Sequence, residues 1–195
     1  MSAGRPIQFN PEKALERAMQ LFWLKGYEST SLDNLLVTMG ISKSSFYQAF
    51  KSKRNIFESS IQSYQEMLVN ELKGKLKEAG SGKKFIETLF YSVADETSET
   101  EDRRGCLIIN TANEFSQIDP KIAHLVSESL DKITTIFEQA ILQSQNEGEI
   151  SQKKEARSLA TYLLCCMSGL KNMVKAGADR ETIKGIVSIS MRALD

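Results

Sequence analysis

Residues 30–53 read TSLDNLLVTMGISKSSFYQAFKSK, and this pattern predicts two short helices joined by a tight turn. Apolar side chains recur at helical spacing in both halves of the segment. They are Leu32, Leu35, Leu36 and Met39 in the first half, and Phe46, Ala49 and Phe50 in the second. Gly40 ends the first helix, and Ser42 is a suitable N-cap for the second. Two helices connected in this way indicate a helix-turn-helix.

The second of these helices places its polar side chains on one outward face. Ser44 and Gln48 lie opposite the apolar side, with Lys43, Ser45 and Tyr47 beside them. Gln48 can pair with adenine in a major groove, Lys43 can reach guanine or a phosphate, and the serines can bond to base edges or phosphates. The face carries no acidic residue. We therefore expect it to contact duplex DNA.

Two helix starts in the same segment are candidate phosphate sites. Thr30 and Ser31 are both cap residues, and Asp33 follows Thr30 at the spacing of a capping box. Lys53 and Arg54 stand at the start of the next helix. A helix N-terminus beside cations attracts anions. The alternative interpretation is an ordinary hydrated surface, and the spacing alone leaves both open.

The charge distribution supports an anionic partner for the N-terminal part only. The chain has 195 residues, with 25 Lys+Arg and 25 Asp+Glu, so its formal net charge is zero. Residues 1–54 carry eight basic and four acidic side chains, a net charge of +4, which leaves −4 for the rest. A basic N-terminal region on an acidic body suits binding of a polyanion by that region alone.

The remainder of the chain also reads as helix, so we expect an all-α protein of about nine helices. A long fourth helix is predicted from residue 52 to about residue 79, and residues 80–82 are predicted to form a loop. Residues 95–104 are polar and are predicted to be mobile. We expect a three-helix N-terminal region and a larger helical C-terminal region.

Several classes of protein are excluded by what the sequence lacks. No apolar run approaches the ~18–20 residues of a membrane span. The first residues, MSAGRPIQFNPEK, lack the apolar core of a secretory signal. The three cysteines form no disulfide framework, which favours a reducing cytoplasm. With the single histidine His124 and no Cys-x-x-Cys, we expect neither a metal site nor a cofactor.

The segment from Ala14 to Phe57 resembles the DNA-binding domain of the TetR family of bacterial repressors. The matching positions are Ala18, Leu21, Phe22, Gly26, Tyr27, Thr30, Ser31, Gly40, Ile41, Ser42, Lys43, Ser45, Phe46, Tyr47, Phe50, Ser52 and Lys53. The resemblance implies that Thr30, Tyr47 and Lys53 contact phosphates, while the groove-facing residues are Lys43, Ser44, Ser45 and Gln48. Two positions depart from the family pattern. Ser44 stands where glycine is common, and Ala49 stands where histidine or tyrosine is common.

The segment 159–174, LATYLLCCMSGLKNMV, is apolar on almost every side of a helix. Such a helix has to be covered on both faces, by the core of its own chain and by a second subunit. The predicted interface residues are Leu163, Cys166, Gly169, Leu170, Met173, Ile183, Ile186 and Val187. The resemblance also implies dimerisation through the last two long helices. The alternative is a central core helix of a monomer.

The other helices of the C-terminal region are expected to enclose a small, largely apolar effector, as the resemblance implies. The predicted pocket residues are Tyr64, Met67, Phe90, Asn110, Asn113, Phe137, Tyr162 and Met167. Further candidate wall residues are Leu68, Phe85, Leu89, Leu107 and Phe115. Methionine and aromatic side chains suit adaptable apolar pockets. For each of these residues an ordinary core position is the competing interpretation.

Cys106 is a candidate sensor of electrophiles or oxidants. It follows Arg103 and Arg104 at a predicted helix start, and both features stabilise a thiolate. Some TetR-type repressors that sense such reagents resemble the chain around Cys106, and they carry a lysine that corresponds to Lys175. The alternative is a buried cysteine that only packs between helices.

We therefore predict a homodimeric transcriptional repressor that binds palindromic operator DNA and is released by an effector. Residues 1–52 are its predicted DNA-binding domain, and residues 53–195 its effector and dimerisation domain. The rival predictions are a helical adaptor that binds proteins and an enzyme with Cys106 as nucleophile and His124 as base. The enzyme is disfavoured because the chain has a single histidine and shows neither a recognised nucleophile motif nor a glycine-rich phosphate loop.

Overall fold

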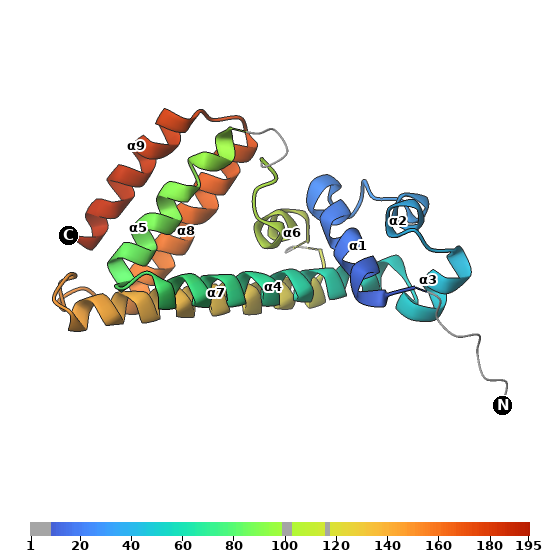
Figure 1. The fold of residues 1–195 in the computed structure, drawn as a ribbon, viewed down its shortest axis with the longest axis horizontal. Helices are drawn as coiled ribbons and strands as arrows, with labels where there is room; N and C mark the ends of the chain where they lie inside the picture. The colour runs from blue at the N-terminus through green and yellow to red at the C-terminus, as the bar shows by residue number, and fades with distance from the viewer. Residues whose placement is uncertain (1–8, 99–102, 116–117) are drawn as a thin grey trace. The chain divides into compact units, whose positions relative to one another are not determined.

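The computed structural model describes residues 9–98, 103–115 and 118–195 and divides into two compact units. The N-terminal unit ends at Glu66 and the C-terminal unit begins at Met67. Within the described residues the structure is all-α with nine α-helices, which confirms the predicted fold class (Figure 1). In this part of the chain, no helix combines the length and hydrophobicity that a membrane span requires.

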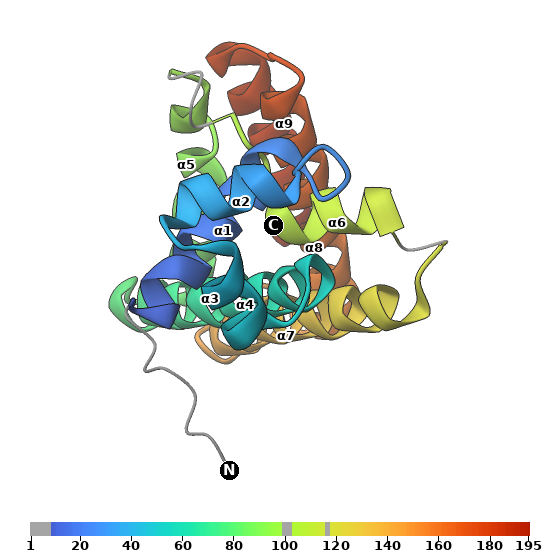
Figure 2. The ribbon, with the colours of Figure 1, turned by 90° about the vertical axis from the view of Figure 1, so that its right-hand side faces the viewer.

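The N-terminal unit contains three short helices and the first part of a long one (Figure 2). They are α1 (Pro11–Lys25), α2 (Leu32–Met39), α3 (Lys43–Phe50) and α4 (Lys53–Glu78). Aromatic rings fill the space between them: the Phe22 and Phe57 centroids lie 5.0 Å apart, edge to face. Leu35 and Phe46 are fully buried in the same unit. Burial of α2 and α3 on one side only leaves their other side exposed.

Caps near the turn define where α2 and α3 begin and end. The Ser31 hydroxyl accepts a hydrogen bond from the backbone N–H of Asn34 at 3.0 Å, and the Asn34 side-chain oxygen Oδ1 accepts one from the backbone N–H of Ser31 at 3.3 Å. The capping box is therefore Ser31–Asn34, and the predicted box from Thr30 to Asp33 is wrong. Gly40 ends α2 with φ +69°, a left-handed conformation that glycine adopts without strain. The Ser42 hydroxyl caps α3 by accepting from the Ser45 amide.

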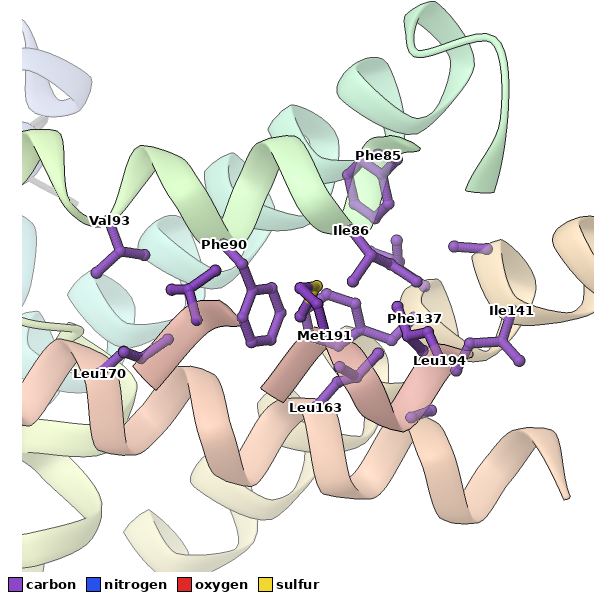
Figure 3. Close-up of a cluster of buried hydrophobic side chains, with 14 of the residues drawn as sticks. Phe85, Ile86, Phe90, Val93, Phe137, Ile141, Leu163, Leu170, Met191 and Leu194 are labelled. Atoms are coloured by element: carbon purple, nitrogen blue, oxygen red, sulfur yellow. The ribbon is translucent and has the colours of Figure 1, made fainter. Parts of the chain in front are cut away.

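The described residues of the C-terminal unit include five further α-helices and two short 3-10 helices, packed around one apolar core. They are α5 (Gly82–Ser92), η1 (Asp95–Thr97), α6 (Leu107–Phe115), α7 (Pro120–Asn146), α8 (Ala156–Lys175), α9 (Arg180–Met191) and η3 (Arg192–Leu194). Figure 3 shows Phe90 of α5, Phe137 of α7 and Leu163 of α8 meeting in this core. The Phe90 and Phe137 ring centroids lie 6.2 Å apart.

The start of α5 lies directly on the backbone of α7. A Cβ at Gly82 would lie 1.8 Å from the carbonyl oxygen of Ala140, so only glycine fits there. Ser81 caps α5 by accepting from the Lys84 amide. Residues 80–82 were predicted to be a loop, but Gly82 is the first residue of α5 because the cap is Ser81.

The polar connection after α5 is held by side-chain contacts where it is described. Glu96 is paired with Lys171 of α8, and Asp95 with Arg180 of α9 at 2.5 Å. Arg103 donates to the carbonyl of Thr97 at 2.7 Å. Residues 95–98 and 103–104 of the segment predicted to be mobile therefore make contacts, and their mobility stays a prediction. The positions 99–102 lie outside the described residues.

Asp179 caps α9 and makes the stability of the fold sensitive to acid. Its carboxylate accepts from the Thr182 amide at 2.8 Å, and the hydrogen bonds from Thr182 lower the pKa of Asp179 below its ordinary 3.8. A lowered folded-state pKa gives stabilisation that is complete above the unfolded-state pKa and is lost as pH falls through the folded-state one. We expect the Asp179→Ala variant to have a lower Tm than wild type at pH 7 and the same Tm as wild type at about pH 2. An equal loss of Tm at both pH values would contradict this.

Candidate nucleic-acid interface

The exposed face of α3 contains the side chains that were predicted to read DNA. Lys43, Ser44, Tyr47 and Gln48 are exposed, while Phe46 is fully buried beneath them. Phe46 supports Tyr47 edge to face, with centroids 5.5 Å apart. This support limits the positions of the Tyr47 ring, so its hydroxyl is presented outward from a rigid base.

The three serines at the start of α3 are bonded to one another. The Ser42 hydroxyl lies 3.0 Å from that of Ser44 and 2.9 Å from that of Ser45. A hydroxyl has one donor and two acceptor sites, so Ser42, which also accepts from the Ser45 backbone N–H, is fully engaged, whereas Ser44 and Ser45 keep capacity for a further partner. The network orders these hydroxyls before any ligand arrives, which reduces the conformational entropy lost on binding.

Thr30 is not part of an exposed phosphate site. Its side chain is completely buried, and its hydroxyl donates to the carbonyl of Gly26 at 2.6 Å. The structure therefore corrects the expectation that Thr30 contacts a phosphate, because the hydroxyl ties the end of α1 to the start of α2. Ser31 remains exposed at the N-terminus of α2.

Lys53 is the candidate cation for a phosphate at the start of α4. Its ammonium lies 4.0 Å from the centroid of the Tyr27 ring, an orientation that holds the side chain by a cation–π contact. Arg54, the second predicted cation, is paired with Glu58 at 2.7 Å. The Arg54 charge is therefore neutralised within α4, whereas its neighbour Lys53 has no ion-pair partner among the described residues.

Arg17 of α1 holds the turn between α2 and α3, and sequence reasoning missed it. Its guanidinium donates to the carbonyl of Met39 at 3.4 Å, and a Cβ at Gly40 would lie 3.3 Å from the same group. The last turn of α2 carries no basic residue of its own. A cation beside the C-terminus of a helix is stabilising. No local pattern could reveal this contact, because Arg17 and Met39 are brought together only by packing of α1 on α2.

We expect Arg17→Ala to weaken binding of duplex DNA by about three- to tenfold. The reason is that each chain loses one modest hydrogen bond, the bond that holds the turn between α2 and α3. Arg17→Lys should restore part of the affinity. Fluorescence anisotropy of a labelled duplex measures both variants, and Tm provides the control for folding. Wild-type affinity in Arg17→Ala would show that the contact does not position α3.

The predicted dimer residues divide into buried and exposed sets. Leu163, Leu170, Ile183 and Val187 are at most 1% exposed and belong to the core of the chain itself. They are therefore not available to a second subunit, which corrects the prediction. The cause is that α8 turns its apolar side toward α5, α7 and α9.

The remaining apolar side chains of α8 and α9 form an exposed stripe, here called the α8–α9 face. It consists of Tyr162, Cys165, Gly169 and Met173 on α8 and Ile189 on α9. Ile189 is 64% exposed and was missed, because its neighbours Ile186 and Val187 carry the helical pattern. Two further predicted residues, Cys166 and Ile186, are half-buried beside this face.

Tyr162 connects the two helices of the α8–α9 face. Its hydroxyl is hydrogen-bonded with the thiol of Cys166, which together with burial raises the pKa of Tyr162 above its ordinary 10.0. Its other side-chain partner is Ser190 of α9. The Tyr162 ring was predicted to line an effector pocket, but it is 40% exposed at this surface.

The structure places the predicted effector residues in different surroundings. Phe90 and Phe137 are fully buried core residues in contact, and Tyr64 is buried against Trp23 with centroids 5.0 Å apart. Met67 and Asn113 are exposed, while Met167 is packed beside the core. Phe90 and Phe137 therefore pack in the core of the C-terminal unit, and an effector pocket at the predicted residues stays a prediction. Among the wider candidates, Phe85 and Leu89 do line a groove, described below.

Lys175 lies against the residue that precedes Cys106. A Cβ at Gly105 would lie 3.5 Å from Cδ of Lys175, and the Lys175 ammonium donates to Asn110 at 3.0 Å. The amide of Asn110 donates in turn to the carbonyl of Arg104. Cys106 itself is half-buried and stands immediately before α6. Lys175 and Cys106 thus share one neighbourhood, although they are far apart in sequence.

A helix-turn-helix with an exposed, acid-free second helix, joined to a larger helical unit, defines a DNA-binding transcriptional regulator. Two family models match the chain: "Bacterial regulatory proteins, tetR family" over residues 14–59, and "Tetracyclin repressor-like, C-terminal domain" over residues 83–188. The chain belongs to the TetR family, which confirms the resemblance. It is therefore a transcriptional regulator and not an enzyme.

Relatives cover almost the whole chain. The uncharacterised regulator YezE of Bacillus subtilis is 30% identical over 193 residues, 98% of this chain and 100% of its own. The transcriptional repressor ComR of Escherichia coli is 28% identical over 98% of this chain and 91% of its own. A cysteine mutant of the TetR family regulator CifR, solved with a 26-base-pair operator duplex, is 26% identical, covers 98% of this chain and 100% of its own, and has a TM-score of 0.84.

Proposed function

We propose that this regulator binds a two-fold symmetric operator as a homodimer and represses transcription until an effector releases it. The exposed face of α3 carries the proposal, because it presents Lys43, Tyr47 and Gln48 on a rigid base with no carboxylate among them. Similarity to the repressor ComR and to CifR, solved on operator DNA, supports both repression and an operator target. Such a regulator acts on the chromosome, in the cytoplasm of a bacterial cell.

Contacts with DNA divide by chemistry. Gln48 and Lys43 are proposed to read base edges, with Ser44 and Ser45 at the rim of the groove. The proposed phosphate contacts are Tyr47, Lys53, Ser31 and Ser42, where helix starts or a cation face outward. Ser44 stands where the family often has glycine, so its side chain adds bulk at the point of closest approach.

Dimerisation is proposed to use the α8–α9 face rather than the buried half of the predicted set. Exposed Met173 and Ile189 lose contact with water when a second copy covers them. An interface on these helices is isologous, because each copy offers the same face to the other. Two copies then present two α3 helices to successive major grooves.

Release is proposed to act through α4. This helix is continuous from Lys53, a proposed phosphate contact, to Glu78 in the C-terminal unit. An effector shifts the equilibrium only if it binds the DNA-competent and DNA-incompetent states with different affinity. A ligand that contacts the C-terminal part of α4 meets this requirement when it changes the position of that helix.

Selection from a pool of random duplex DNA tests the proposal. We expect an enriched palindrome bound by a dimer, with an affinity that falls steeply as salt rises, because phosphate contacts release counterions. Enrichment of no sequence, or of a site without symmetry, would contradict it. The adaptor alternative would give no retention of DNA at all.

A second proposal is that Cys106 senses electrophiles. The packing of the Lys175 side chain against Gly105, the residue before Cys106, supports it, because a lysine next to a thiol favours the thiolate. With Cys165 and Cys166 replaced by serine, Cys106 is the single thiol of the chain. Addition of that thiol across the double bond of N-ethylmaleimide, with the proton delivered to the ring carbon, should lower operator affinity. A native protein that takes up no maleimide would end this proposal.

A further inference from the structure

We propose that a groove between the end of α4 and α5 binds small amphipathic organic anions, a carboxylate or sulfonate on an apolar body. The groove has a volume of about 300 Å³, which is in the range of small-molecule sites. Its lining residues are Lys75, Glu78, Ala79, Lys84, Phe85, Thr88, Leu89 and Ser92. Binding at the groove stands by itself, whereas its regulatory consequence rests on the proposed function.

The base of the groove is apolar and anchored in the core. Phe85 is 1% exposed, and Ala79 and Leu89 are half-buried against the same cluster of core side chains. These side chains cannot move apart without loss of core packing, so the groove is formed before a ligand arrives. An apolar body laid on this base removes its own surface and that of Leu89 from water.

A second, more open hollow continues along the same side of α5. It has a volume of about 590 Å³ and is lined by Lys84, Glu87, Thr88, Tyr91, Ser92, Asp95, Arg180 and Lys184. The two hollows share Lys84, Thr88 and Ser92, so they adjoin each other. Tyr91, 44% exposed, adds an aromatic surface to the second hollow.

The charges around the groove favour an anion. The two hollows together are lined by four cations and three carboxylates, although residues 55–195 carry a net charge of −4. Lys75 is paired with Glu71, and Arg180 with Asp95. Lys84 has no ion-pair partner anywhere in the described part of the chain and lies in both hollows. Its ammonium is therefore the group that we assign to the head of the ligand.

The position of the groove gives a bound ligand direct contact with α4. Lys75 and Glu78 are in the last turn of that helix, and Lys53 is in its first. A ligand wedged between the end of α4 and α5 therefore touches the same continuous helix that begins at a proposed phosphate contact. This is the contact that the release mechanism requires.

Two dyes with the same apolar body provide the test. The anion 8-anilinonaphthalene-1-sulfonate and the uncharged N-phenyl-1-naphthylamine differ by the sulfonate. We expect the anion to bind the full-length protein at one site per chain, about tenfold more tightly than the uncharged dye, as one favourable charge contact provides. Equal or tighter binding of the uncharged dye would overturn the choice of an anion.

Three variants locate the site. Lys84→Glu should weaken binding of the anion by about tenfold or more and leave the uncharged dye unchanged. Thr88→Trp places an indole in both hollows from an exposed position and should weaken both dyes. The matched control is Lys73→Glu, an exposed lysine of α4 that does not line the groove. Binding unaffected by both Lys84→Glu and Thr88→Trp would overturn the site.

Binding of the selected operator, measured separately from binding of the dye, distinguishes a failure of this inference from a failure of the proposed function. Operator binding without dye tests only the proposed function, and dye binding without operator tests only the groove. If both hold, saturating anion should release operator from wild type and not from Thr88→Trp. Release that persists in Thr88→Trp would assign the effect to another site and overturn the link between groove and α4.

Discussion

Replacing Lys43 with glutamate is expected to weaken binding of the selected operator by at least about 100-fold at about 0.1 M salt. The variant places a carboxylate on a face of α3 that otherwise has none, and it does so at both half-sites of a dimer. Each substitution removes the attraction between the Lys43 ammonium and nearby phosphates, and the new carboxylate is repelled by the same phosphates. Because Lys43 is exposed, folding is not expected to change. Anisotropy titrations over a range of salt concentrations measure the loss.

Lys132→Glu is the matched control for this charge reversal. Lys132 is an exposed lysine of α7 and is not among the proposed DNA contacts. The slope of log affinity against log salt should become shallower in Lys43→Glu and stay unchanged in Lys132→Glu. If both variants lose affinity equally, the loss reflects total charge and the assignment of the α3 face fails.

Replacing Ile189 with glutamate is expected to convert the dimer into monomers at micromolar concentration. Ile189 is 64% exposed in the isolated chain, so the monomer accepts the change, whereas a dimer would have to bury two unpaired carboxylates. Operator affinity should fall by about 100-fold or more, because the two DNA-binding units are no longer linked. Sedimentation equilibrium and anisotropy measure the two effects separately.

Leu142→Glu is the control for this variant, since Leu142 is an exposed leucine of α7, 46% accessible, outside the α8–α9 face. It should remain dimeric and bind operator as wild type does. A dimeric Ile189→Glu protein would show that another surface joins the two chains. In that case the buried position of Leu163 and Val187 would still exclude the buried half of the predicted interface residues.

The helices themselves were predictable because their signals are local. Caps such as Ser42 and Asp179 act over three residues, and apolar spacing is read within one or two turns of a helix. The outward face of α3 was predictable for the same reason, because Phe46 fixes the inner side of a helix of only eight residues. In α8 the same method failed, since apolar residues occur around the whole helix and periodicity then selects no side.

The amino-acid order alone was sufficient for the helical class, the turn at Gly40 and the family, since each depends on residues close together in the chain. Packing alone decided that Thr30 is buried, that Lys53 lies over the Tyr27 ring, and that Arg17 reaches Met39. It also decided which half of the apolar residues on α8 and α9 became core. The physical reason is that burial and pairing depend on neighbours from other helices, and those neighbours are defined only when the helices pack.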